Sequence, residues 1–581
     1  MVKRRTNAAT GQGGHGPRRW PWILGGTLLL VVVAGGVWLA ATGTPPGQLL
    51  ELVGRGGDTK LREPMRPARG GPRAIILAFD GVGADELHEA LASGGMPSLA
   101  AVLGRPTGER GEYAHGYAVP GVLSILPSTT IAAWTSVFTG EPPGRTGVPG
   151  NEWFERRTGR FHAPAPVSVD GNEHALAVYS DSLMSALVRV PTLYDQVQLR
   201  SYVSLSQVHH GADLLVLPSA KSFGDLMTAA IRGASDETVE RELYAELDRG
   251  ATRSLVKNLE EHGIPDVLTV YFPGVDLYTH LAPDPLASER AYLTEVLDSA
   301  VAAVLDAYRA AGALDDTWIV MVADHGHTPT LNDDRHALGT DGDDEPPAVL
   351  ARAGFRLRPF VLEPDSADAD FQATVAYQGA FAFIYLADRS TCLEPGLRCM
   401  WERPPRLEED VLPVVRAFDA ANRRGEGVPE LQGTLDLILV RTPSADDVTA
   451  PLSVWDGRRL VPLHRWLARH PRPDLLDLER RLEGLTLGPY GDHAGDILLL
   501  ARTGSERPIE ERFYFSHEYR SWHGSPTRQD SEIPLVVARA DMRGADVRAL
   551  VHRLVGERPD QLDIAPLVRA LLAPNESLGL R

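Results

Sequence analysis

RAIILAFDGVGADELHEAL, residues 73–91, joins a wholly apolar run to an aspartate, a glycine-containing turn and a helical pattern. A short run without polar residues is typical of a strand that is buried on both faces, as in a parallel sheet covered by helices. Helix-like segments such as residues 289–312 lie between further runs of this kind. Those runs are VLTVYF (267–272), WIVMVA (318–323), DILLLA (496–501) and IPLVVA (533–538). The alternation predicts an α/β fold built on a doubly wound, mostly parallel sheet.

The regular pattern is interrupted between about residues 331 and 487. This segment opens with the acidic, loop-like sequence LNDDRHALGTDGDDEPP and contains both cysteines of the chain. We interpret it as an inserted cap subdomain, so that residues 73–330 and 488–581 together form the core.

The N-terminus has the pattern of a membrane anchor. Residues 20–41 contain no charge and are about as long as the roughly 20 apolar residues that cross a bilayer. The basic residues 1–19 precede them and predict a cytoplasmic tail, with the rest of the chain periplasmic or extracellular. Residues 42–72, rich in Gly, Pro and Arg, then form a linker. A cleaved signal peptide is the alternative, but the apolar run is long for one. We therefore expect a single-pass membrane protein.

Charge and cysteine content limit the partners and the compartment. The formal net charge of −19 argues against a nucleic acid duplex, whose phosphates favour a basic surface. It does not argue against a small phosphate ester, because bound metal ions can supply positive charge. Cys392 and Cys399 bracket a short segment with a Pro-Gly pair, so a local disulfide is expected if the domain is exported. Two free thiols are the alternative, and nothing in the sequence indicates an oligomeric state.

Acidic and histidine side chains follow three of the apolar runs. Asp80 follows the first, Asp276 lies just past the second, and Asp324 with His325 follows the third. Because ligand sites of open α/β sheets lie beyond the carboxyl ends of the strands, these residues are expected to converge. His280 is four residues after Asp276, which places both on one face of a helical turn. Carboxylates and imidazoles suit zinc or a similar divalent ion, although a single such Asp is more often a cap or turn residue.

A cluster of hydroxyl side chains precedes a helical pattern in LPSTTIAAWTSVFTG, residues 126–140. A hydroxyl at a helix N-terminus lies where free backbone N–H groups favour an anion. A threonine there can also ligate a metal ion, which would make it a usable nucleophile. The alternative is an ordinary N-cap threonine.

Five motifs occur in the order FDGVG, PSTTIAAWTSVFTG, GVDLYTH, ADHGH and SWHGSPTRQDSEIPLVVA. Together they resemble the type I phosphodiesterase/nucleotide pyrophosphatase branch of the alkaline phosphatase superfamily. The resemblance extends from about residue 73 to residue 331 and from about residue 488 to the end, and it is weak in the insertion. It implies that the core is an alkaline phosphatase-like catalytic domain that hydrolyses phosphate esters with two divalent ions, expected to be Zn²⁺.

The resemblance also assigns roles to individual residues. It implies that Thr130 is the nucleophile. It implies one zinc site formed by Asp80, Asp324, His325 and Thr130, and another formed by Asp276, His280 and His523. Two other late histidines, His493 and His517, compete with His523 for the last position. Asn151 and His327 are candidates for contact with the substrate, and for both the alternative is a role in a turn.

The expected function is metal-dependent hydrolysis of a phosphodiester or phosphomonoester through a phospho-threonine intermediate, outside the cytoplasm. A sulfatase is disfavoured because neither cysteine lies in the C/S-x-P-x-R segment that such enzymes need. A phosphoethanolamine-type transferase shares a threonine nucleophile and metals but usually has several membrane spans. A non-catalytic, membrane-anchored binding protein of the same fold is the alternative from another class.

Overall fold

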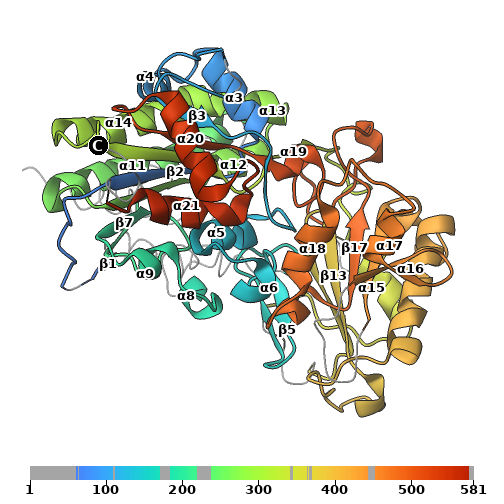
Figure 1. Cartoon of the computed structure of the whole chain (residues 1–581). Helices are drawn as coiled ribbons and strands as arrows, with labels where there is room; N and C mark the ends of the chain where they lie inside the picture. Colours follow the sequence, from blue (N-terminus) through green and yellow to red (C-terminus); the bar gives the residue numbers. More distant parts are fainter. Residues whose placement is uncertain are drawn as a thin grey trace, which may run out of the picture.

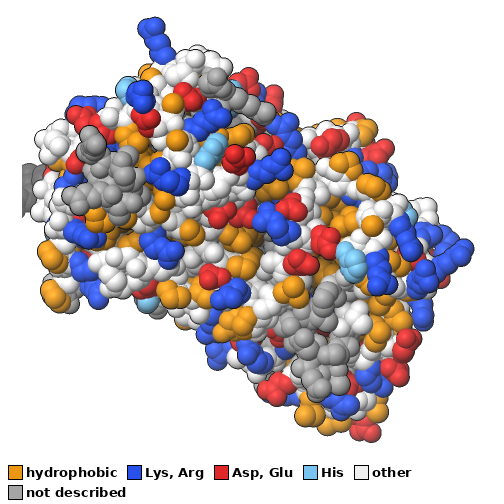
Figure 2. Space-filling model, viewed as in Figure 1, with side chains coloured by type: hydrophobic (Ala, Val, Ile, Leu, Met, Phe, Trp, Pro, Cys, Tyr) orange, Lys and Arg blue, Asp and Glu red, His pale blue; other side chains and the backbone are white. Residues whose placement is uncertain are grey.

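The computed structural model describes residues 60–62, 64–108, 111–169, 183–218, 237–339, 345–362, 364, 369–442 and 452–574. The chain forms two lobes, each built around its own sheet (Figure 1). On the face shown in Figure 2, acidic and basic side chains are interspersed over both lobes. The shared boundary of the two lobes lies close to the candidate site described below.

The first lobe contains an eight-stranded mixed sheet. Its order is β1 (Lys60–Leu61), β8 (Leu214–Val216), β7 (Ser201–Ser204), β9 (Val267–Phe272), β2 (Arg73–Phe79), β10 (Thr317–Ala323), β20 (Leu535–Ala538) and β3 (Gly116–Ala118). The five strands from β8 to β10 are parallel to one another. The α/β class and the parallel centre agree with the sequence prediction.

Both faces of this sheet are covered by helices. In β2, Ile75 and Leu77 face one core, whereas Ala74 and Ile76 face the other, as the two-residue period of a strand requires. The first core is closed by α3 (Ala84–Ala92), α4 (Pro97–Leu103), α11 (Glu237–His262), α13 (Pro285–Tyr292) and α14 (Asp298–Ala310). The second is closed by α5 (Thr130–Thr139), α9 (Leu193–Val197), α20 (Gly544–Val555) and α21 (Ile564–Leu571).

The second lobe contains a six-stranded sheet in which every pair of neighbours is antiparallel. Its order is β12 (Ala373–Gln378), β13 (Phe381–Leu386), β17 (Ile497–Ala501), β14 (Leu435–Arg441), β15 (Leu452–Trp455) and β16 (Leu460–Pro462). The helices α15 (Glu345–Arg352), α16 (Leu412–Arg424), α17 (Leu463–Leu467) and α18 (Leu478–Thr486) accompany it. The hairpin β5 (Trp153–Glu155) and β6 (Arg160–His162) packs on the same hydrophobic core.

Three expectations from the sequence need correction. The run DILLLA was assigned to the core sheet with residues 488–581, but β17 lies between β13 and β14 of the second sheet. The apolar pattern of this run fits either sheet, and its antiparallel pairing with β13 and β14 places it in the second one. Strand β20 is in the first sheet but runs antiparallel to β10. The expected linker 42–72 includes β1, which pairs with β8 at the sheet edge.

The expected cytoplasmic tail 1–19 and membrane span 20–41 lie outside the described residues. Among the described residues, no helix is both long enough and apolar enough to cross a membrane. Cys392 and Cys399 form a disulfide in the second lobe, with a Cα–Cα distance of 4.8 Å.

Candidate metal centre

The carboxyl ends of three parallel strands in the first sheet carry the acidic residues expected from the sequence. Asp80 directly follows β2, and Asp324 with His325 directly follows β10. Asp276 lies in α12 (Gly274–Thr279), which begins one residue after Pro273 at the end of β9. Strands β9, β2 and β10 are neighbours, so their ends meet at one edge of the sheet.

The first group of possible metal ligands contains Asp80, Asp324 and His325, whose donor atoms all lie within 4.8 Å of one another. The His325 Nε2 atom is 3.7 Å from Asp80 Oδ1 and 3.2 Å from Asp324 Oδ2. All three side chains are buried. The Thr130 Oγ1 atom is 3.2 Å from the same His325 Nε2. The structure therefore brings together all four residues expected at one ion.

The second group contains Asp276, His280 and His523, with donor atoms also within 4.8 Å of one another. Asp276 Oδ1 is 3.6 Å from His280 Nε2 and 3.9 Å from His523 Nε2. His280 is the C-cap of α12, so the spacing of four residues places it beside Asp276. His523 directly follows the short strand β18 (Ser521–Trp522), which pairs with β11 (Thr328–Pro329).

The protonation pattern of the histidines fits metal binding. The Nδ1 atom of His280 lies 2.8 Å from the Ser521 carbonyl, and that of His523 lies 3.0 Å from the Ser128 carbonyl. Because a carbonyl oxygen only accepts, both Nδ1 atoms carry the proton, and the lone pair of each neutral ring is on Nε2. His325 has the same arrangement through a 3.3 Å contact of Nδ1 with the Gly326 carbonyl. Such anchoring is typical of metal-ligating histidines.

Burial makes the first group unfavourable without a cation. Burial, and then the nearby charge of Asp324, raises the pKa of Asp80 well above its usual value. Burial likewise raises the pKa of Asp324. Asp80 Oδ1 and Asp324 Oδ2 are buried and have no hydrogen-bond partner in the described part of the chain. A divalent ion between these oxygens would satisfy both, so the residues fit a metal site.

The histidine pKa values favour the ligating form. Burial lowers the pKa of His280 to about 4 and that of His325 to about 3, and lowers the pKa of His523 well below its usual value. All three rings are thus neutral near pH 7, as metal ligands must be. Burial alone would raise the pKa of Asp276, but the neighbouring His280 and His327 lower it overall, so this carboxylate is charged.

Helix α5 presents the candidate nucleophile. Thr130 is its first residue, and Thr129, the N-cap, makes no capping bond with its side chain. Asn151 Oδ1 instead accepts the Ile131 N–H at 3.1 Å, which fixes Asn151 against the helix N-terminus beside Thr130. Among the described residues, the Asn151 Nδ2 group makes no hydrogen bond, and its side chain lies at a helix N-terminus, where the backbone favours an anion.

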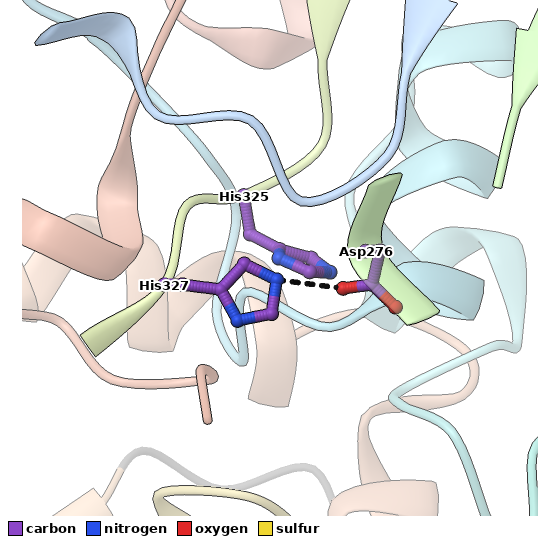
Figure 3. A group of neighbouring side chains, drawn as sticks. All are labelled: Asp276, His325 and His327. Carbon is purple, nitrogen blue, oxygen red and sulfur yellow. Dashed lines mark hydrogen bonds and ion pairs between the residues drawn. The ribbon is translucent and has the colours of Figure 1, made fainter. Parts of the chain in front are cut away.

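The remaining predicted residues differ in their distance from the centre. His327 was expected to contact substrate or cap a turn, but its Nε2 atom is 2.9 Å from Asp276 Oδ1 (Figure 3). His493 is buried elsewhere, with Nδ1 2.8 Å from the Gly147 carbonyl. His517 is exposed. Neither competitor of His523 belongs to a group of possible metal ligands within the described residues.

Sequence reasoning missed the residues that support the ligands. The Tyr271 hydroxyl donates to Asp80 Oδ2, and Gln561 Nε2 donates to the Asp324 carbonyl at 3.0 Å. Ser521 contacts two of the histidines, through its carbonyl and its hydroxyl. Tyr271 lies within the apolar strand β9 and pairs with Ala78 of β2, and this register cannot be read from the local sequence.

A turn of the second lobe also reaches the centre. It lies between β12 and β13, at residues 378–380. Gln378 Oε1 accepts the Asn151 N–H at 2.7 Å, and the Ala380 N–H donates to the His523 carbonyl at 3.2 Å. Gly379 has a φ of +65°, and a Cβ at this position would overlap the His523 carbonyl oxygen. The turn therefore requires glycine and holds both Asn151 and His523.

Comparison with known families gives a match over most of the first lobe. Residues 74–346 match the model of the family described as "Type I phosphodiesterase / nucleotide pyrophosphatase". This range contains six of the seven expected ligands, all except His523. No curated protein matches the chain.

Solved structures with overall similarity are distant in sequence. Phosphonoacetate hydrolase from Sinorhizobium meliloti 1021, solved with phosphonoformate, is 17% identical, with a TM-score of 0.46, and the match covers 89% of this chain and 99% of that one. Murine ectonucleotide pyrophosphatase/phosphodiesterase 5 is 12% identical, with a TM-score of 0.46 and coverage of 86% and 95%.

Proposed function

We propose that this chain, whose residues 74–346 belong to the type I phosphodiesterase/nucleotide pyrophosphatase family, hydrolyses phosphate esters through a phosphorylated Thr130. The family places the chain among the phosphoric ester hydrolases. The substrate is a small phosphodiester or phosphomonoester, and the reaction requires two divalent ions. The observation that carries the proposal is the position of the Thr130 hydroxyl, 3.2 Å from Nε2 of His325, a member of the first ligand group.

One ion would be held by Asp80, Asp324, His325 and Thr130, and the other by Asp276, His280 and His523. Mixed carboxylate and imidazole ligands suit Zn²⁺. When bound, the ions would lower the pKa of the Thr130 hydroxyl and offset negative charge on the phosphoryl group.

Thr130 and its surroundings supply the remaining chemistry. Its Oγ1 atom gives up its proton to solvent and forms a bond to phosphorus while the ester bond to the leaving group breaks, and the leaving oxygen keeps the bonding electrons and takes up a proton. The N-terminal N–H groups of α5 and the Asn151 amide face the negative phosphoryl oxygens. Water then attacks the phospho-threonine and breaks the bond between Thr130 Oγ1 and phosphorus. The proton that the water loses restores the Thr130 hydroxyl, and phosphate or a phosphomonoester is released.

The test combines metal analysis with two model esters. We expect the purified full chain to contain about two zinc ions and to hydrolyse p-nitrophenyl phosphate or bis-p-nitrophenyl phosphate. A chelator should abolish turnover, and added zinc should restore it. The ratio of the two rates distinguishes a monoesterase from a diesterase.

Two outcomes would contradict the proposal. Protein without metal and without turnover would favour a binding protein of the same fold. Transfer of a phosphoryl-containing group from a lipid donor to an acceptor alcohol, without hydrolysis, would favour a transferase.

For the cellular location, the proposal is a catalytic domain outside the cytoplasm, anchored by residues 20–41. The disulfide between Cys392 and Cys399 supports it, since disulfides persist in oxidising compartments. The measurement is alkylation of intact cells and lysates with a thiol reagent. Both cysteines should remain unlabelled until a reductant is added, and free thiols in the native chain would contradict export.

A further inference from the structure

His327 makes a contact that the family assignment does not explain. It is fully buried in the loop after β10, and it points toward Asp276 together with His325 (Figure 3). Its Nε2 atom is 2.9 Å from Asp276 Oδ1, and its Nδ1 atom is 3.1 Å from Ser521 Oγ. Both ring nitrogens therefore have a defined neighbour.

The Ser521 hydroxyl is compatible with two tautomers of His327. It donates either to the Thr279 carbonyl at 2.9 Å or to His327 Nδ1 at 3.1 Å. When it donates to His327, the Nε2–H of the ring donates to the charged carboxylate of Asp276. When it donates to Thr279, Ser521 Oγ accepts a hydrogen bond from the His327 Nδ1–H, and the lone pair on Nε2 is available to a cation beside Asp276.

In this second tautomer, His327 Nε2 and Asp276 Oδ1 are two acceptors 2.9 Å apart, and a divalent ion bound by both atoms removes their repulsion. His327 Nε2 and the donor atoms of Asp276 and His325 also lie within 4.8 Å of one another, which makes a third group of possible ligands.

We propose that His327 is a metal ligand and that, with Asp276 and His325, it forms a third ion position between the two expected ones. This inference rests on the proposed metal centre. The position shares Asp276 with one outer group and His325 with the other. Because His325 Nε2 has one lone pair, an ion here excludes a fully ligated ion at Asp80 and Asp324. The middle position can therefore be filled only while the position at Asp80 and Asp324 is not fully ligated, so we place the first ion there and expect it to move when the second ion arrives.

The first experiment is a titration of the metal-free full chain with Co²⁺, followed by visible absorption, which reports the ligands of the ion. We expect the spectrum of the first equivalent to change shape when the second is added, because the first ion changes its ligands. Competition with a chromophoric chelator gives the affinity for Zn²⁺. His327→Ala should weaken binding of the first ion at least about tenfold and leave the second nearly unchanged.

His327→Gln separates ligation from positioning. Glutamine can donate a hydrogen bond to Asp276 but is a poor replacement for an imidazole ligand. We expect the same loss of affinity as in His327→Ala; a first-ion affinity and Co²⁺ spectrum like those of the wild type would mean that His327 only orients Asp276 and would overturn the proposal. His493→Gln, which alters a buried histidine outside all three groups, is the matched control.

A measurement on the wild type avoids any dependence on variant folding. Crystals grown with one equivalent of Zn²⁺ should show an anomalous peak within bonding distance of His327 Nε2. A peak at an outer group alone would overturn the inference but leave the proposed function intact. A chain that binds no divalent ion in any experiment would contradict both.

Discussion

Buried aspartates follow apolar strands in both lobes, but their charges are balanced differently. In the second lobe, Asp388 follows β13 and forms ion pairs with Arg403 at 2.8 Å and Arg406 at 3.1 Å. It also accepts the Ser390 N–H at 3.0 Å as a helix cap. In the first lobe, Asp80 and Asp324 form no ion pair with Lys or Arg within the described residues, and the basic residue beside them is His325, whose buried ring is neutral.

The difference shows what marks a metal site in this molecule. A buried carboxylate needs a nearby positive charge, and the chain itself supplies one to Asp388. At Asp80 and Asp324 the chain supplies neutral imidazoles and leaves the positive charge to a bound cation. The same residue type, after an apolar strand in each case, is structural in one lobe and a candidate ligand in the other.

The largest expected effect is on the nucleophile of the first lobe. Thr130→Ala should reduce hydrolysis of the better model ester by at least about 10⁴-fold, because no other hydroxyl takes its place. Steady-state kinetics at saturating zinc measures this. Thr129→Ala is the matched control, since it alters the neighbouring threonine that makes no capping bond, and it should retain activity within about tenfold. Equal losses in both variants would contradict the assignment of Thr130.

A substitution in the second lobe should change the stability of the chain and leave its metal binding unchanged. Arg156 and Asp496 form an ion pair in which both side chains are buried. Arg156→Met should lower the free energy of unfolding by about 3–5 kcal/mol, because it leaves Asp496 buried without its cation. Urea denaturation measures the loss, and zinc content should stay at the wild-type value. Arg459→Ala, which removes an exposed pair with Asp456, should cost at most about 1 kcal/mol.

A smaller effect is expected at the disulfide of the second lobe. It closes a loop with a sequence separation of seven. Replacing both cysteines by serine should lower the free energy of unfolding by about 2.5 kcal/mol, from the chain entropy of so short a loop. Hydrolysis at 25 °C should be unchanged, since the disulfide is remote from the ligand groups in the sequence and the fold. A loss of zinc in this variant would show that the lobes are less independent than the comparison indicates.

The smallest effect is a pH dependence in the first lobe. Burial raises the pKa of Asp248 from 3.8 to about 7, and its carboxylate accepts the Tyr292 hydroxyl at 2.8 Å and the Gly274 N–H at 3.2 Å. A raised pKa means that the folded state binds the proton more tightly, so the stability it gives is lost as the pH rises toward 7. Between pH 5 and pH 7 this loss is about 2 kcal/mol.

Asp248→Asn removes this titration. The difference in unfolding free energy between wild type and variant should therefore shift in favour of the variant by that amount from pH 5 to pH 7, as measured by urea denaturation at each pH. A difference that does not change with pH would contradict the raised pKa.

The sequence predicted the α/β class and the parallel centre because buried parallel strands are continuously apolar. It also placed Asp80, Asp276 and Asp324 at one edge, because strand ends converge. It could not assign β17, whose ILLLA pattern fits a parallel or an antiparallel partner equally well. The contact between His327 and Asp276 depends on the loop after β10, and local sequence does not determine that geometry.

The turn between β12 and β13 has a mechanical consequence. Gln378 accepts a hydrogen bond from the backbone of Asn151, and the Ala380 N–H donates to the backbone of His523. One short turn therefore binds two segments of the candidate site. The lobes cannot swing apart at this point without breaking those hydrogen bonds and displacing a candidate ligand. Substrate that enters or leaves while these hydrogen bonds are intact must therefore pass other parts of the site, and the second lobe supports the backbone of Asn151 and His523.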